Sequence, residues 1–335
     1  MGRVLDKILS AQLFYLICVQ ISRCKFKIIG KARELFPVFV IYLQSQDGTP
    51  LAGLRFFAKG EFAMPIRADY HLHSHFSGDS EAPMEDMIRR ALELGYTEMC
   101  FTEHMDPDFP VREDIPAGTF EVNTDSYLYD LLKYRKKYEG KIRVNFGVEL
   151  GLQPHIAREN AAYVRSHDFD FVIASTHIVD HRDPGYPEYY DGISDEEGYR
   201  AYFREILRSV RTFSDFDVYG HLDYVIRYSR SRDRDYSYEK YADLFDPILE
   251  TLIENGKGIE LNTGGFRKGL KEFHPCDGVL KAYRAKGGEI ITVGSDAHRP
   301  EDIGSDFSLA AERLKECGFS YYCTFEKRTP SFHKL

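Results

Sequence analysis

The sequence lacks the features that mark secreted, membrane-spanning and strongly basic proteins. Its six cysteines include no CxxC pair, so neither a disulfide framework nor a cysteine-ligated zinc site is indicated. Asp and Glu number 53 against 44 Lys and Arg, and the net charge of -9 argues against a nucleic-acid binder whose affinity comes from neutralising phosphates. With 43% hydrophobic and 29% charged residues, the composition is typical of a globular protein. We therefore expect a cytoplasmic protein with no membrane partner.

Residues 1–63 differ in charge from the rest of the chain. They carry nine Lys and Arg against four Asp and Glu, whereas residues 64–335 carry 35 against 49. The apolar run Ile8–Ile21 follows two basic residues, as in a secretion signal, but no small-residue cleavage site follows it, and it is too short to span a bilayer. We interpret Met64 as the natural start, residues 1–63 as an extension that is untranslated or disordered, and residues 64–335 as one domain.

From Met64 onward, short β-rich runs alternate with amphipathic helical stretches. The predicted strands are Ile66–Leu72, Thr97–Thr102, Ile142–Leu150, Phe169–Thr176, Phe216–His221, Gly258–Asn262 and Glu289–Gly294. The predicted helices are Pro83–Leu94, Asn123–Tyr138, His155–Arg165, Asp195–Phe213, Tyr238–Asn255, Val279–Ala285 and Phe307–Glu316. Seven such units predict parallel strands with right-handed crossovers, either closed into a barrel or laid open.

Each predicted strand ends in polar residues, and function in parallel β/α architectures gathers at that end of the strands. Residues two apart on a strand share a face, so His71 and His73 would both point into the barrel, as would Asp296 and His298. Imidazole and carboxylate groups suit Zn²⁺, Fe²⁺ or Mn²⁺. Because all seven strands end in this way, the sequence predicts a multinuclear metal site at one rim.

The other histidines are not expected to bind metal. His75 would crowd the face that His71 and His73 share. Four more lie on predicted helices, loops or the tail, where an ordinary hydrogen-bonded histidine is the simpler interpretation: His155, His167, His274 and His333.

The ordered strand-end motifs resemble those of the polymerase and histidinol phosphatase (PHP) superfamily across residues 66–325. The motifs are HxH after the first strand, TEH after the second, GxE after the third, STH after the fourth, GHxD after the fifth and SDAH after the last. The resemblance implies a distorted seven-stranded (β/α) TIM-like barrel with three divalent metal ions, which are zinc, iron or manganese. Single-domain length and the segments 220–228 and 260–268 resemble the histidinol-phosphatase branch.

The resemblance also implies a role for individual residues. It implies that one metal is held by His71, His73, Glu149 and Asp296, a second by Glu149, His177 and His221, and a third by Asp79, His104 and His298. Many members have histidine where this chain has Asp79, and a carboxylate there adds a negative charge and a harder oxygen. Arg227 and Arg267 occupy the positions of two arginines that bind the substrate phosphate.

We therefore expect a metal-dependent phosphatase that hydrolyses L-histidinol phosphate, a small-molecule phosphate monoester, in histidine biosynthesis. A nuclease or nucleotide phosphoesterase of the same family is the alternative, and it would call for a basic stripe or an appended domain. A metal-loaded structural module is a third interpretation, which degraded ligand positions would mark. This chain has the whole ligand set and an acidic barrel segment.

The residue that gives the leaving alcohol its proton is left open among Asp180, His181 and Asp223, which follow two of the strands. Residues 183–195 are expected to form a loop that either recognises the cationic part of the substrate and acts as a lid or is an ordinary solvated loop. Its candidate contact residues are Tyr186, Glu188, Tyr189, Tyr190 and Asp191.

Overall fold

The computed structural model describes residues 27–29, 38–44, 50–57 and 65–335, and the chain divides into two units, 1–63 and 64–335. In the first unit, strands β1 (Lys27–Ile29), β2 (Val38–Gln44) and β3 (Pro50–Phe57) pair antiparallel in the order β1-β2-β3. No strand was predicted there. The apolar run Ile8–Ile21 and Met64, on which the sequence interpretation depends, lie outside the described residues.

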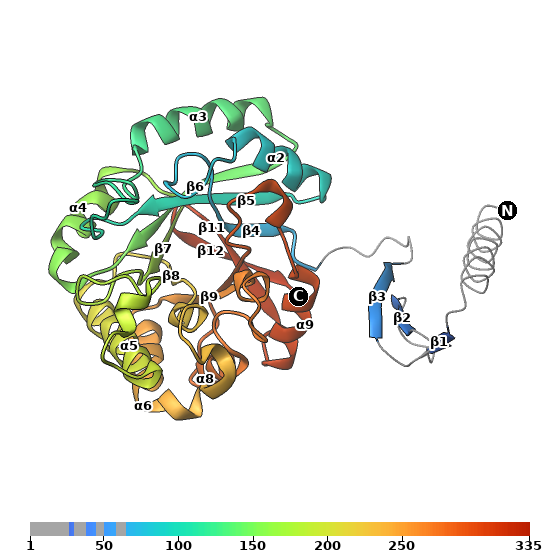
Figure 1. Cartoon of the computed structure of the whole chain (residues 1–335). Helices are drawn as coiled ribbons and strands as arrows, with labels where there is room; N and C mark the ends of the chain where they lie inside the picture. Colours follow the sequence, from blue (N-terminus) through green and yellow to red (C-terminus); the bar gives the residue numbers. More distant parts are fainter. Residues whose placement is uncertain (1–26, 30–37, 45–49, 58–64) are drawn as a thin grey trace. The chain divides into compact units, whose positions relative to one another are not determined.

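Seven parallel strands form the barrel of the second unit (Figure 1). They are β4 (Ala68–Leu72), β5 (Glu98–Met105), β6 (Arg143–Gly151), β7 (Phe171–Ser175), β8 (Val218–Tyr219), β9 (Gly258–Asn262) and β10 (Ile291–Gly294), in that spatial order. The first and last strands meet just beyond β10, where Asp296 N donates to His71 O at 2.9 Å and His73 N donates to Ala297 O at 2.9 Å. The nearly closed seven-stranded barrel is therefore confirmed.

Helices follow the strands and lie on the outside of the barrel (Figure 1). Each predicted helix is present, with its ends shifted by a few residues at most: α2 (Met84–Glu93), α3 (Thr124–Lys137), α4 (Ala157–Ser166), α5 (Asp195–Thr212), α6 (Ala242–Glu254), α8 (Asp277–Ala285) and α9 (Phe307–Glu316). Shorter elements were not predicted: α7 (Gly264–Arg267) and the 3₁₀ turns η1 (Pro154–Ile156), η2 (Pro187–Tyr190), η3 (Tyr224–Arg227), η4 (Arg232–Asp235), η5 (Glu239–Tyr241) and η6 (Pro300–Asp302).

Local sequence explains where these helices begin and which face they bury. Ser194 caps α5 by accepting from Glu197 N, and the Glu197 side chain accepts from Ser194 N in return, which completes a capping box. On α2, Met84, Met87 and Ile88 recur at helical spacing and are buried against the barrel. None of the helices within the described residues is long and apolar enough to cross a membrane.

The C-terminal hairpin of β11 (Tyr321–Glu326) and β12 (Thr329–Lys334) was not predicted. It packs against the N-terminal end of the barrel, where Phe325 O accepts hydrogen bonds from Tyr70 Oη at 2.8 Å and from Asn145 Nδ2 at 3.1 Å. The Phe325 ring also contacts Phe171 at 5.1 Å between centroids. The hairpin therefore covers the N-terminal end of the barrel, and a functional site is expected at the opposite, C-terminal end of the strands.

Candidate metal and phosphate site

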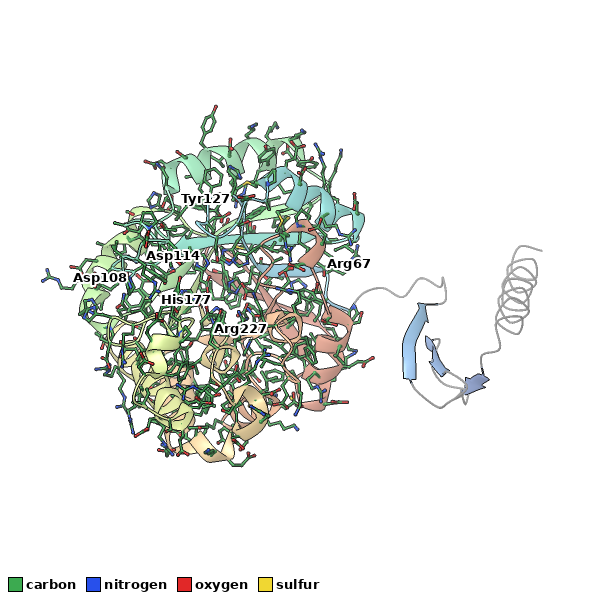
Figure 2. All side chains as sticks on the ribbon, in the orientation of Figure 1. Arg67, Asp108, Asp114, Tyr127, His177 and Arg227 are labelled. Atoms are coloured by element: carbon green, nitrogen blue, oxygen red, sulfur yellow. The ribbon has the colours of Figure 1, made fainter. Side chains whose placement is uncertain are left out.

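A cavity of about 740 Å³ opens at the C-terminal ends of the strands. Its floor is formed by histidines and carboxylates in the last residues of β5 and β6 or just after β5, β7, β8 and β10, and its rim carries Arg227, Arg267, Lys268 and Arg299. Figure 2 shows His177 and Arg227 among the side chains that fill the middle of the barrel domain. An acidic and imidazole-rich floor beneath a cationic rim suits a ligand whose anionic group is held between the two.

Glu149, near the end of β6, is the centre of the floor and is fully buried. One carboxylate oxygen, Oε2, lies 3.2 Å from His71 Nε2, 3.5 Å from His73 Nε2 and 3.1 Å from His104 Nδ1. Burial raises the pKa of Glu149, but the facing imidazoles of His71, His177 and His104 outweigh it, and the net pKa lies well below its usual value. Glu149 is therefore ionised, and its Oε2 is available to a cation that binds between these imidazoles.

The other oxygen of Glu149 faces a second pair of histidines. Oε1 lies 3.3 Å from His177 Nε2 and 2.8 Å from His221 Nε2, and it accepts a hydrogen bond from Ser175 Oγ at 2.7 Å. A single carboxylate thus stands between two groups of imidazoles. This is the arrangement of a bridging ligand.

Asp79, Asp296 and His298 complete the cluster on the side nearest the opening. Asp79 Oδ2 lies 3.1 Å from His298 Nε2, and Asp79 Oδ1 lies 3.6 Å from His104 Nε2. Asp296 Oδ1 is 3.8 Å from His71 Nε2 and equally far from His73 Nε2. The structure therefore brings together all nine of the residues that the family resemblance implied as metal ligands.

Several donor atoms of this cluster are buried and have no hydrogen-bond partner among residues 65–335. They are His71 Nε2, His73 Nε2, His104 Nδ1, Glu149 Oε2 and His298 Nε2. A buried polar atom without a partner costs about 1–3 kcal/mol, so five in one pocket call for a ligand that all of them can share. Sets of three donors lie within 4.8 Å of one another, as in His71, His73 and Glu149. The residues present therefore fit divalent cations.

Groups behind the histidines fix the direction in which their free nitrogens point. Nδ1 of His71 contacts Glu260 Oε1 at 2.7 Å, which leaves Nε2 facing the cluster. In the same way His177 Nδ1 contacts Asp106 Oδ1 at 2.7 Å. Such contacts orient metal-binding imidazoles and raise their basicity. Sequence reasoning missed this role, although Glu260 lies in a predicted strand, two residues before its end, and Asp106 lies two residues beyond His104.

The two predicted phosphate-binding arginines both line the cavity. Arg227 ends η3, is 8% exposed, and donates from Nη2 to Asp296 Oδ2 at 3.1 Å. Arg267 ends α7 and donates from Nη2 to the backbone oxygens of Ser295 and Asp296 at 2.5 and 2.9 Å. Both guanidinium groups are thus tethered beside Asp296.

Most of the residues expected outside the site do lie outside it. His75 is exposed, His155 Nε2 lies 2.8 Å from Asp108 Oδ2 on the surface, and His333 contacts Thr324 on the C-terminal hairpin. His274 differs, because it is fully buried and contacts Arg227 Nε at 2.9 Å. It was interpreted as an ordinary loop residue because nothing in its local sequence indicates that the chain returns to the end of β9 there.

The loop of residues 183–195 contributes less to the cavity than a substrate-binding lid would. Tyr189 and Tyr190 are buried in the core, where their hydroxyls donate to Gly198 O and Val225 O. Tyr186 donates to Asp114 on the surface. Of this loop, Asp183 lines the cavity. The tyrosine-rich sequence therefore reflects packing.

Asp180, His181 and Asp223, the three candidate donors of a proton to the leaving alcohol, are not among the residues that line the cavity. Asp180 pairs with Arg208, and His181 is 71% exposed. Asp223 is fully buried beneath His274, with Oδ1 at 2.5 Å from His274 Nδ1. In this geometry Asp223 supports the site and does not face a ligand.

Comparison with known proteins agrees with this site. Residues 69–264 match the model of the PHP domain. The chain is 32% identical over 265 residues to a histidinol-phosphatase of Lactococcus lactis, covering 77% of this chain and 94% of the relative. It is 30% identical over 263 residues to a probable histidinol-phosphatase of Clostridium acetobutylicum, covering 78% and 97%.

A solved structure gives the same result. The crystal structure of histidinol phosphate phosphatase from Lactococcus lactis, complexed with zinc, L-histidinol and phosphate, matches with a TM-score of 0.73 and 30% identity. The match covers 79% of this chain and 98% of that one. By the span of the domain match and by these relatives, the chain belongs to the PHP family.

Proposed function

We propose that this protein is a metal-dependent phosphatase that hydrolyses L-histidinol phosphate to L-histidinol and phosphate. The observation that carries the proposal is a cluster of nine histidine and carboxylate side chains, seven of which line a cavity that two tethered arginines also line. Histidinol-phosphatases at 30% and 32% identity, and a similar structure with histidinol and phosphate bound, support this substrate. The cytoplasmic location and the absence of a nucleic-acid partner stay predictions.

The donor set is suited to three divalent cations, either zinc, iron or manganese. His71, His73, Glu149 and Asp296 would hold one, and Glu149, His177 and His221 a second. Asp79, His104 and His298 would hold the third. When bound, such cations stabilise negative charge on the phosphoryl oxygens and make water acidic enough to supply a nucleophile near neutral pH.

The protein's own groups bind the phosphate and keep it in place. A phosphate monoester is a dianion that resists attack, so its charge must be offset as the bond to the leaving alcohol breaks. Arg227 and Arg267 both line the cavity and both contact Asp296, and planar guanidinium groups match phosphate oxygens better than ammonium groups do. Tyr224 also lines the cavity, and its ring lies 5.0 Å from the His221 ring between centroids.

A phosphate-release screen tests the proposal. The full chain, reconstituted separately with Zn²⁺, Mn²⁺ and Fe²⁺, is assayed with L-histidinol phosphate, nucleoside monophosphates and single-stranded DNA. We expect release from L-histidinol phosphate at least a hundredfold above the others, which is roughly 2.7 kcal/mol of discrimination. Preferential cleavage of a nucleotide or of DNA would replace the proposal with the phosphoesterase alternative. His71→Ala should abolish release, whereas His333→Ala, on the distant hairpin, should not.

A further inference from the structure

A buried chain of three side chains runs from the core to the cavity. His274 lies between α7 and α8, and its backbone pairs with Asn262 at the end of β9, with N to O distances of 2.7 and 3.0 Å. Its Nδ1 lies 2.5 Å from Asp223 Oδ1, and its Nε2 lies 2.9 Å from Arg227 Nε. Asp223 and His274 are both 0% exposed. The imidazole is therefore held at both nitrogens and by its backbone.

The chemistry of the three groups fixes where the proton of His274 resides. A guanidinium N–H can only donate, so His274 Nε2 must be the unprotonated acceptor. Nδ1 then carries the proton and donates it to Asp223. Burial and the neighbouring Arg227 charge lower the pKa of His274, which agrees with a neutral ring. Asp223 also accepts from Cys276 N at 2.8 Å and Tyr236 Oη at 2.9 Å, so the far end of the chain is anchored.

We propose that His274, anchored by Asp223, is a positioning residue that aims the guanidinium of Arg227 at the substrate phosphate. This inference rests on the proposed function, in which Arg227 binds that phosphate. An arginine beside a carboxylate commonly forms a bidentate pair. Here His274 occupies the Nε edge, so Asp296 contacts Arg227 through Nη2 alone.

Because His274 and Asp296 contact different nitrogens of Arg227, Asp296 Oδ1 and Arg227 Nη1 are not used in this contact. Asp296 keeps Oδ1 toward His71 and His73, while Oδ2 meets Arg227 Nη2. Because the guanidinium is planar and rigid, fixing Nε and Nη2 also fixes the direction of Nη1. Within residues 65–335, Nη1 has no hydrogen-bond partner, and Arg227 lines the cavity. Without His274, the guanidinium could turn its Nε edge onto Asp296 and away from phosphate.

Two conservative substitutions at one position separate this role from simple packing. In His274→Gln the amide oxygen reaches the place of Nε2 and can accept from Arg227. In His274→Asn the shorter side chain reaches only the place of Nδ1 and can contact Asp223 but not Arg227. The measurements are KM, kcat and the competitive inhibition constant of inorganic phosphate, with the metals at saturation, together with metal content and the melting temperature.

We expect His274→Asn to raise KM and the phosphate inhibition constant about tenfold or more, as loss of a hydrogen bond to a charged group does, with metal content unchanged. His274→Gln should stay within about threefold of the original protein. In an Arg227→Ala background, His274→Asn should add nothing further to either constant, because the group that it positions is gone.

Equal effects of the Gln and Asn variants would overturn the proposal, as would a further tenfold loss from His274→Asn in the Arg227→Ala background. An unchanged inhibition constant in Arg227→Ala would remove both the arginine's role and that of His274. Failure of the proposed function gives a different result, namely no phosphate release from L-histidinol phosphate by the original protein. Phosphate inhibition can then still be measured on whichever monoester the screen identifies.

Discussion

Glu260 contacts His71 through Oε1 at 2.7 Å and accepts from His221 N through Oε2 at 2.9 Å, so one buried carboxylate supports histidines from two different strands. We predict that Glu260→Gln lowers metal affinity by about 10- to 100-fold, because an amide is a weaker acceptor for the His71 ring and can present its NH₂ group to it. Metal titration of the apoprotein measures this. Glu93→Gln, on the exposed face of α2, is the matched control. An unchanged metal affinity in Glu260→Gln would show that the Glu260 carboxylate is not required to orient His71 for metal binding.

Gly294, the last residue of β10, lets that strand approach the supporting pair. A Cβ at this position would lie 2.2 Å from Glu260 Oε1 and 2.4 Å from His71 Cβ. We therefore expect Gly294→Ala to destabilise the fold by about 1–3 kcal/mol and to reduce bound metal, since both neighbours are packed and cannot move aside. Gly185→Ala is the comparison, because the nearest atoms to its Cβ would belong to the Asp183 side chain, the first at 2.9 Å. Denaturant unfolding and metal analysis should separate the two variants, and a fully metal-loaded Gly294→Ala protein would contradict the prediction.

The metal affinity should increase with pH. Burial lowers the pKa of His177, but Asp106 and Glu149 outweigh it and raise the pKa to about 10 in the metal-free protein. The imidazole is therefore protonated at pH 7, and a bound cation must displace that proton. Because binding releases a proton below pH 10, each increase in pH over the range 6–9 should strengthen it.

Calorimetric titrations in buffers of different ionisation enthalpy measure the protons released. Asp106→Asn removes the charge next to His177 and should reduce their number. Metal affinity independent of pH in the original protein would contradict the assignment of His177 as a ligand.

Arg267 is tethered to the backbone at Ser295 and Asp296 and lines the cavity. If Arg267 binds the substrate phosphate, Arg267→Ala should raise KM about tenfold or more while metal content stays normal, because the lost interaction is with the substrate. Arg90→Ala, which removes a surface ion pair on α2, should leave KM unchanged. An unaltered KM in Arg267→Ala would take the phosphate-binding role away from this residue.

The strands and most helices could be predicted because their sequences carry local signals, such as the buried run of β6 and the capping box of α5. The convergence of His71, Glu149 and Asp296 could be predicted from topology, since parallel strands in a barrel end at one rim. His274 could not, because its role depends on a loop that returns to pair with Asn262, and loop paths leave no periodic signal. The hairpin at Tyr321–Lys334 was missed because only half of it faces the barrel.

The proposed function requires that this cluster of side chains binds cations for phosphate hydrolysis. Elemental analysis of the purified full-length protein, followed by removal of its metal with a chelator and stepwise return of Zn²⁺ or Mn²⁺, tests this most directly. We predict three divalent ions per chain, and we expect phosphate release from L-histidinol phosphate to disappear with the metal and to recover with it. Protein that contains no bound metal, or that is equally active after the metal has been removed, would contradict a metal-dependent hydrolysis at this site.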